Sequence, residues 1–111
     1  MQLEIKKYLL DIESSIEIIY SHISNTGSYS EFKENQLVYD AVERRLGIIG
    51  EAVWQIDAID PKIDFTDKKK IIGFRHIVTH DYDLVTPDII WKIVKVNIPV
   101  LEQEVKKYLN R

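Results

Sequence analysis

The chain of 111 residues has no cysteine, and glycine and proline are scarce. The missing cysteine excludes disulfides, thiolate metal sites, iron–sulfur clusters and cysteine nucleophiles. The four glycines and three prolines leave long stretches without a helix breaker. Uninterrupted apolar runs reach only three or four residues, as in 37–39 and 52–54, so the sequence predicts no membrane span.

An excess of positive charge is also missing. The 15 basic and 18 acidic residues give a net charge of −3, which argues against a protein that coats nucleic acid non-specifically. A local basic patch is still possible at that charge. The first seven residues include an acid and no long apolar stretch, so they do not form a signal peptide, and we expect a cytoplasmic protein. The length predicts one domain over residues 1–111.

Apolar residues recur at intervals of three and four, which predicts helices. Thr66-Asp67 and Thr86-Pro87 are good helix starts, because threonine caps a helix and proline fits its first position. Pro99 should kink the last helix, since it lacks an N–H group. The predicted helices cover residues 3–24, 35–58, 66–82 and 86 onward. Short connections between them predict an all-α antiparallel four-helix bundle.

The second predicted helix is expected at the centre of the bundle, because its apolar stripe is wide. The stripe consists of Val38, Val42, Ile49, Val53 and Ile56, widened by Leu37, Ala41, Ile48 and Ala52. Glu51 on this helix predicts ion pairing with another helix, since a buried charge needs a partner. Trp54, like Trp91, is expected to anchor the core or an interface.

Groups that could carry chemistry gather in residues 73–83. Two of the three histidines, His76 and His80, stand within five residues of each other, directly after Arg75. Lys68, Lys69 and Lys70 precede them, so that positions 67–80 hold four basic residues against one acid. An anion is therefore expected to bind here. The same lysines also fit a solvated helix face.

A straight helix does not place Arg75 and His80 on one face, because five residues turn about 140° around the axis. The two side chains converge if the helix loosens before His80, if the long arginine stem swings round, or if two copies meet at a dimer axis. Arg75 could instead be a structural arginine that pairs with Asp81 or Asp83. His76 fits either a cleft wall or the surface.

Arginine and histidine together suit the chemistry of a phosphodiester. A guanidinium binds phosphate through two hydrogen bonds and stays charged. An imidazole gives or takes a proton near neutral pH. RNA brings its own nucleophile, the ribose 2′-hydroxyl, so such a site needs no serine or cysteine.

The pattern Arg75-x4-His80-x-Tyr82 resembles the Arg-x4-6-His signature of HEPN-domain proteins, in the form found in HepT-like toxins. Four further segments resemble that family in the same order: Asp40-Ala41-Val42-Glu43-Arg44-Arg45-Leu46, Ile48-Ile49-Gly50-Glu51-Ala52, Ile71-Ile72-Gly73-Phe74 and Ile98-Pro99-Val100-Leu101, with Phe32 ahead of them. The likeness covers nearly the whole chain. One residue departs from it, since the family usually has asparagine where this chain has His76.

The resemblance implies a HEPN-like helical bundle that forms homodimers with the motifs of both subunits in a shared cleft. It implies a metal-independent ribonuclease without a cofactor, acting on RNA, with tRNA as one candidate. Arg75 and His80 would then be catalytic, with Lys68, Lys69, Lys70 and His76 as candidates for RNA binding.

The resemblance also implies the toxin half of a type VII-like toxin–antitoxin pair. The partner would be a MntA-like nucleotidyltransferase antitoxin that adds AMP to Tyr82, within a hetero-oligomer of unspecified size. A different class of function remains open, in which the chain is a non-catalytic helical partner or substrate-binding subunit of a nucleotidyltransferase. A third is a helical module whose cleft binds nucleotides without chemistry.

Overall fold

The computed structural model describes residues 1–76 and 86–111. Every regular element within these residues is helical, which confirms the predicted all-α class. The elements are α1 (Leu3–Ile23), α2 (Tyr29–Glu34), α3 (Gln36–Ile59), α4 (Lys68–Gly73), the 3-10 helix η1 (Phe74–His76), α5 (Pro87–Lys92), the π-helix η2 (Ile93–Asn97) and α6 (Ile98–Tyr108). No helix in this described part is long and apolar enough to cross a membrane.

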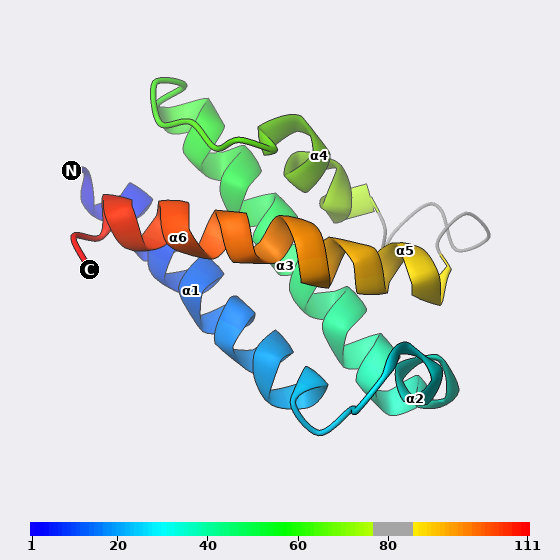
Figure 1. Ribbon diagram of the computed structural model, residues 1–111. Helices are drawn as coiled ribbons and strands as arrows, with labels where there is room; N and C mark the ends of the chain where they lie inside the picture. The colour runs from blue at the N-terminus through cyan, green and yellow to red at the C-terminus, as the bar shows by residue number, and fades with distance from the viewer. Residues whose placement is uncertain (77–85) are drawn as a thin grey trace.

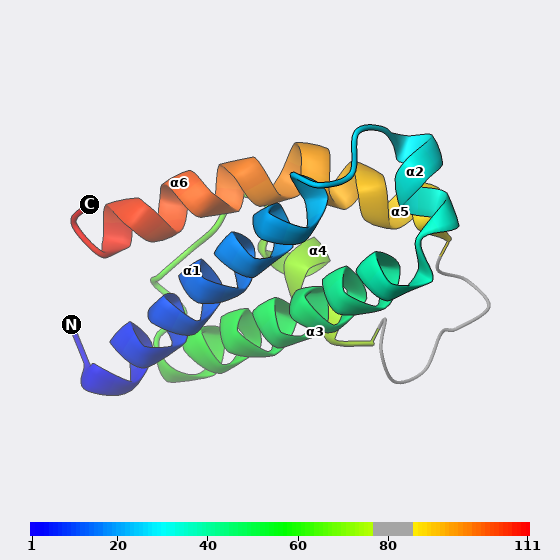
Figure 2. The same cartoon turned by 90° about the horizontal axis from the view of Figure 1, so that it is seen from below.

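The helices α1 and α3 lie side by side and run in opposite directions (Figure 1). The α6 helix packs on α1, while α4 and η1 pack on α3 (Figures 1 and 2). Both chain termini lie at one end of the molecule, and η1 and the start of α5 lie towards the opposite end. The predicted four-helix bundle arrangement and the dimer remain predictions.

One apolar cluster forms the core, and it comes mainly from α1, α3, η2 and α6. The predicted stripe of α3 is confirmed, because four of its five residues are buried and Val38 is half-buried. The expectation that Leu37 widens this stripe is wrong, since Leu37 is 83% exposed. It stands five residues before Val42 and therefore lies about 140° from that buried residue around the axis.

The short helix α2 is an element that the apolar pattern did not predict. Its N-terminus has a capping arrangement, in which the Ser28 hydroxyl accepts a hydrogen bond from the Glu31 N–H at 3.3 Å. The Glu31 carboxylate accepts one from the Gly27 N–H at 2.6 Å. Ser-x-x-Glu before an aromatic residue is a sequence signal for a helix start. Phe32 from this helix is fully buried against Trp91.

The predicted third helix is confirmed near its expected start, since α4 begins at Lys68. The expected threonine cap is wrong, because Asp67 occupies the N-cap position without a side-chain cap hydrogen bond and the Thr66 hydroxyl donates to Glu104. The α-helical part ends at Gly73, and residues 74–76 form the tighter 3-10 turn η1. The predicted continuation to Tyr82 lies outside the described residues. The backbone thus changes from α-helical to 3-10 geometry at Phe74, so that the angles between side chains of a straight α-helix do not apply to residues 74–76.

The predicted fourth helix begins at the expected residues, with Thr86 at the N-cap position and Pro87 in the first turn, but the Thr86 side chain makes no cap hydrogen bond. The Thr86 hydroxyl donates to the Asp88 carboxylate. Further along, the chain widens into the π-helix η2 directly before α6, where the Ile98 N–H donates to the Ile93 carbonyl five residues earlier. This turn precedes Pro99, which lacks an N–H group. The kink predicted at Pro99 stays a prediction.

Residues of η2 and α6 hold the segment that leads into α4. The Glu104 carboxylate accepts hydrogen bonds from the Thr66 backbone N–H and hydroxyl, each at 3.1 Å. The buried Asn97 amide donates to the Asp67 carboxylate at 2.9 Å. The start of α4 is therefore attached to η2 and α6, and α4 also packs on α3.

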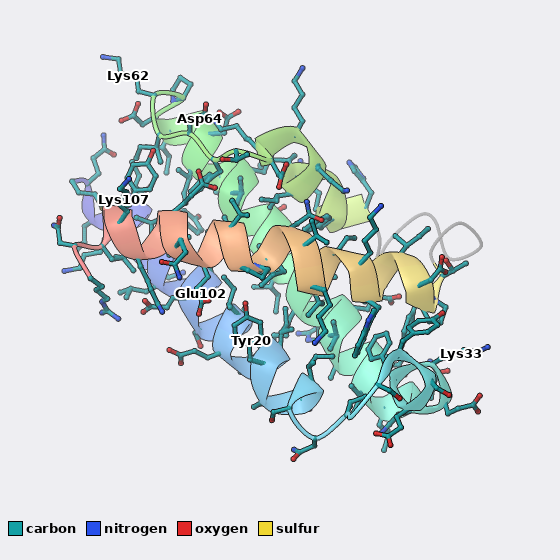
Figure 3. All side chains as sticks on the ribbon, in the orientation of Figure 1. Tyr20, Lys33, Lys62, Asp64, Glu102 and Lys107 are labelled. Atoms are coloured by element: carbon teal, nitrogen blue, oxygen red, sulfur yellow. The ribbon has the colours of Figure 1, made fainter. Side chains whose placement is uncertain are left out.

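We expect the stability of the fold to depend on pH through Tyr20, a residue of α1 that contacts α6. Burial, the charge of Glu102 and a hydrogen bond from Tyr20 to that carboxylate raise the pKa of Tyr20 to about 12 (Figure 3). An unfolded tyrosine ionises near pH 10, so the free energy of unfolding should fall as the pH rises from 10 to 12. Chemical denaturation at each pH should show a smaller fall for Tyr20→Phe. Equal falls in both proteins would contradict this.

Candidate active site

The backbone of Arg75 rests directly on Gly50 of α3. A Cβ atom at Gly50 would lie 2.7 Å from the Arg75 backbone nitrogen and 2.7 Å from the Ile71 carbonyl oxygen, which is closer than real Cβ contacts. Phe74 is buried beside this point. Only glycine allows two backbones to approach so closely. This close approach fixes the position of the Arg75 backbone against α3.

The Arg75 side chain contacts two groups that α3 supplies. Its Nε is 3.2 Å from a Glu51 carboxylate oxygen. Its guanidinium carbon is 4.1 Å from the centre of the Trp54 ring, which is cation–π geometry. The other Glu51 oxygen accepts a hydrogen bond from the Gln55 amide at 3.2 Å. Glu51 and Trp54 thus both orient the guanidinium, while 28% of the Arg75 side chain stays exposed.

Each of these contacts is weak in free energy, because both partners of Arg75 are partly exposed. A solvated ion pair contributes about 0–1 kcal/mol, and an exposed cation–π pair about 0.5–1 kcal/mol. Their main effect is therefore geometric. They reduce the number of conformations open to a long side chain, and such orientation favours binding of a planar anion such as phosphate.

The predicted partner for Glu51 on another helix is confirmed, and that partner is Arg75. The alternative pairing of Arg75 with Asp81 or Asp83 involves residues outside the described part. Trp54 was expected in the core or an interface; it is 38% exposed and therefore not a core residue, it stacks on the arginine, and its place in an interface stays a prediction. The contact with Arg75 was not predicted, although residues three apart on a helix share a face, as Glu51 and Trp54 do.

The three lysines at the start of α4 differ from one another. The Lys68 ammonium is 2.8 Å from Asp57 and 3.4 Å from Asp64. Burial lowers the pKa of Lys68, but hydrogen bonds and the charges of the two carboxylates outweigh it and raise that pKa. Lys69 and Lys70 are exposed. Lys68 is therefore paired within the fold, while its two neighbours face solvent, and RNA binding by the three lysines stays a prediction.

Of the other predicted site residues, the structure describes His76 but not His80 or Tyr82. His76 is exposed, next to Arg75 in η1. His80 and Tyr82 lie outside the described residues, so their predicted roles stay predictions. Within residues 1–76 and 86–111, no three acidic or histidine side chains are grouped as a metal site would require.

Comparison with known proteins gives one consistent result. Residues 5–108 match the family model described as ribonuclease HepT-like. A candidate RNase of Methanocaldococcus jannaschii is 34% identical over 93% of this chain and 94% of its own length. A second candidate RNase of that organism is 33% identical over 96% of this chain and 88% of its own length.

A candidate RNase of Caldanaerobacter subterraneus is 32% identical, over 96% of this chain and 95% of its own length. No solved structure matches the chain significantly. The family model covers nearly every helix described above, including the Gly50–Arg75 contact, and the relatives match over most of their length. The chain therefore belongs to the HepT-like ribonuclease family.

Proposed function

We propose that this chain is a metal-independent endoribonuclease that acts as a toxin. The proposal is supported by membership of the HepT-like ribonuclease family. The observation that carries it is the oriented, partly exposed guanidinium of Arg75, held by Glu51 and Trp54. A fixed cation with planar hydrogen-bond donors at the surface is suited to an RNA phosphate.

The reaction uses the RNA itself as nucleophile. The ribose 2′-oxygen attacks the adjacent phosphorus, a bond from phosphorus to that oxygen forms, and the bond to the 5′-oxygen of the next nucleotide breaks. His80 acts either as the general base that takes the proton of the 2′-hydroxyl or as the general acid that gives a proton to the leaving oxygen. Arg75 stabilises the negative charge that develops on the phosphoryl oxygens. The products are a 2′,3′-cyclic phosphate and a 5′-hydroxyl.

Tyr82 is the proposed control point of the enzyme. A MntA-like nucleotidyltransferase antitoxin would transfer AMP from ATP to its phenolic oxygen, so that the bond from the phenolic oxygen to the α-phosphorus forms, the bond from that phosphorus to the pyrophosphate oxygen breaks, and pyrophosphate leaves. The added phosphodiester brings negative charge and bulk close to the motif, where it competes with the RNA phosphate for Arg75. Two copies of the chain would form the active homodimer, with both motifs in one cleft. The antitoxin would assemble with that dimer, and both would act in the cytoplasm.

The activity is tested with the purified, unmodified chain and a mixture of RNAs that includes tRNA. We expect cleavage that persists in excess EDTA and leaves 2′,3′-cyclic phosphate ends. DNA of the same sequence is the control, because it lacks the 2′-hydroxyl and should stay intact. Mass spectrometry of protein produced together with the nucleotidyltransferase should find AMP on the peptide that contains Tyr82.

Failure of each experiment has its own meaning. Intact RNA together with normal growth of cells that express the chain would contradict the nuclease. The chain would then act as a non-catalytic partner of the nucleotidyltransferase. AMP on another residue would contradict only the role of Tyr82, because the cleavage chemistry does not depend on it.

The lysines of α4 give a further prediction that separates RNA contact from structure. Lys69→Ala with Lys70→Ala should weaken RNA binding and reduce its salt dependence, because each exposed cation releases about one counterion. The thermal midpoint should hardly change. Lys68→Ala should instead lower that midpoint, since it leaves Asp57 and Asp64 without their shared cation. Filter binding at several salt concentrations and thermal melts measure both quantities. The reverse pattern would contradict the assignment.

A further inference from the structure

An exposed tryptophan lies beside the proposed phosphate-binding arginine. Trp54 is 38% exposed, although a large aromatic side chain is normally covered. It stands on α3 one turn after Gly50, the residue on which the Arg75 backbone rests. The guanidinium lies 4.1 Å from the ring centre, so the ring and the cation form one stacked unit. The exposed part of the indole is thus fixed next to a cation.

This pair matches the two parts of a nucleotide that proteins recognise without reading sequence. A cation attracts the phosphate, and an aromatic ring stacks on the flat base. Aromatic rings and stacked arginines are the usual supports for unpaired bases in RNA-binding proteins. The same two groups occur here in contact with each other, on elements that Gly50 holds together.

We propose that Trp54 stacks on one nucleobase next to the phosphate that Arg75 binds. The substrate at the cleavage point is therefore RNA with an unpaired base. A base inside a duplex is covered on both faces by its neighbours and cannot stack on a side chain. This inference rests on the proposed function for its choice of RNA, and it adds a subsite and a substrate class to that function.

The decisive test combines a change in the protein with a change in the nucleic acid. One oligomer is single-stranded DNA, which the proposed chemistry cannot cleave. The other has the same length and charge but carries no bases. We expect the wild-type protein to bind the oligomer with bases about tenfold more tightly than the one without, the effect of about one stacked base.

In Trp54→Leu this preference should shrink by about that factor, because the stack is lost from the complex with the base-bearing oligomer, while the oligomer without bases has no stack to lose. Any effect of Trp54 on the orientation of Arg75 is the same for the two oligomers and cancels in the ratio. Trp54→Phe keeps an aromatic face and should retain most of the preference. An unchanged preference in Trp54→Leu would overturn the proposal, and circular dichroism shows whether that variant is folded.

Fluorescence gives an independent readout in a Trp91→Phe background, where Trp54 is the remaining tryptophan. The single-stranded oligomer should quench its emission, and a duplex of the same length should not. A ring that instead packs against a second copy of the chain would give no quenching, and Trp54→Leu would turn a dimer into a monomer in size-exclusion chromatography. That result would overturn the proposal.

These binding measurements need no cleavage, so they can fail separately from the proposed function. Quenching without any ribonuclease activity would leave a nucleic-acid subsite on a protein that is not a nuclease. Cleavage by a protein whose Trp54→Leu variant keeps its preference for bases would leave the nuclease and remove the subsite.

Discussion

Replacing Arg75 with alanine should slow RNA cleavage by about 10²–10³-fold, the usual effect of removing one group that stabilises transition-state charge. Arg75→Lys should recover only part of the rate, because an ammonium keeps the charge but not the two parallel hydrogen bonds to phosphate. Single-turnover rates on one defined RNA measure the effect. Stability should change little, since the contacts of Arg75 with Glu51 and Trp54 are partly exposed.

His80→Ala should be at least as damaging, with a loss of about 10²–10⁴-fold, because proton transfer by a positioned side chain contributes that much. Expression of the wild-type chain should arrest growth, and either variant should relieve the arrest. Arg44→Ala is the matched control for Arg75→Ala, since Arg44 is an exposed arginine on α3 and its loss changes the net charge by the same amount. Wild-type cleavage rates in both Arg75→Ala and His80→Ala would refute the assignment of the motif.

A methyl group at Gly50 should disturb both the fold and the activity. In Gly50→Ala the new Cβ meets two backbone atoms, the Arg75 nitrogen and the Ile71 carbonyl oxygen, and neither can rotate away. Overpacking of this kind costs about 1–3 kcal/mol, against a gain of up to about 1 kcal/mol from the better helix former. The shift of η1 away from α3 should also slow cleavage, by about 10²-fold if Arg75 moves 1 Å.

The control for this variant is Gly73→Ala in the neighbouring helix. A Cβ there meets nothing within 4 Å, so this exposed position should gain about 0.5–1 kcal/mol and keep its activity. Urea unfolding curves and cleavage rates of the two variants form the comparison. Equal stability of Gly50→Ala and Gly73→Ala would show that the close approach at Gly50 does not constrain the fold.

The long amphipathic helices could be predicted from the sequence because a helix that buries one face has apolar residues at intervals of three and four. The stripes of α1 and α3 follow this pattern, and Asn35 at the start of α3 acts as a cap as its residue type suggests. The helix α2 could not be found in that way, since six residues are too few to show a period. Its only trace is the capping pattern that begins at Ser28.

The surroundings of Arg75 could be predicted only in part, because they join residues 21 to 25 positions apart in the chain. The need of Glu51 for a partner was visible in the sequence, but the identity of that partner was not. The contact at Gly50 depends on how α4 crosses α3. The sequence pattern within one helix does not determine where and at what angle it crosses another. The exposure of Trp54 likewise could not be predicted, because an aromatic side chain with a polar N–H group suits both the core and a surface.

Both termini lie at one end of the molecule, away from η1 and the start of α5. A fluorophore, a surface tether or a fused reporter attached to either terminus would therefore extend away from Arg75. Single-molecule or surface-immobilised measurements of nucleic-acid capture can use either attachment point and leave the arginine accessible.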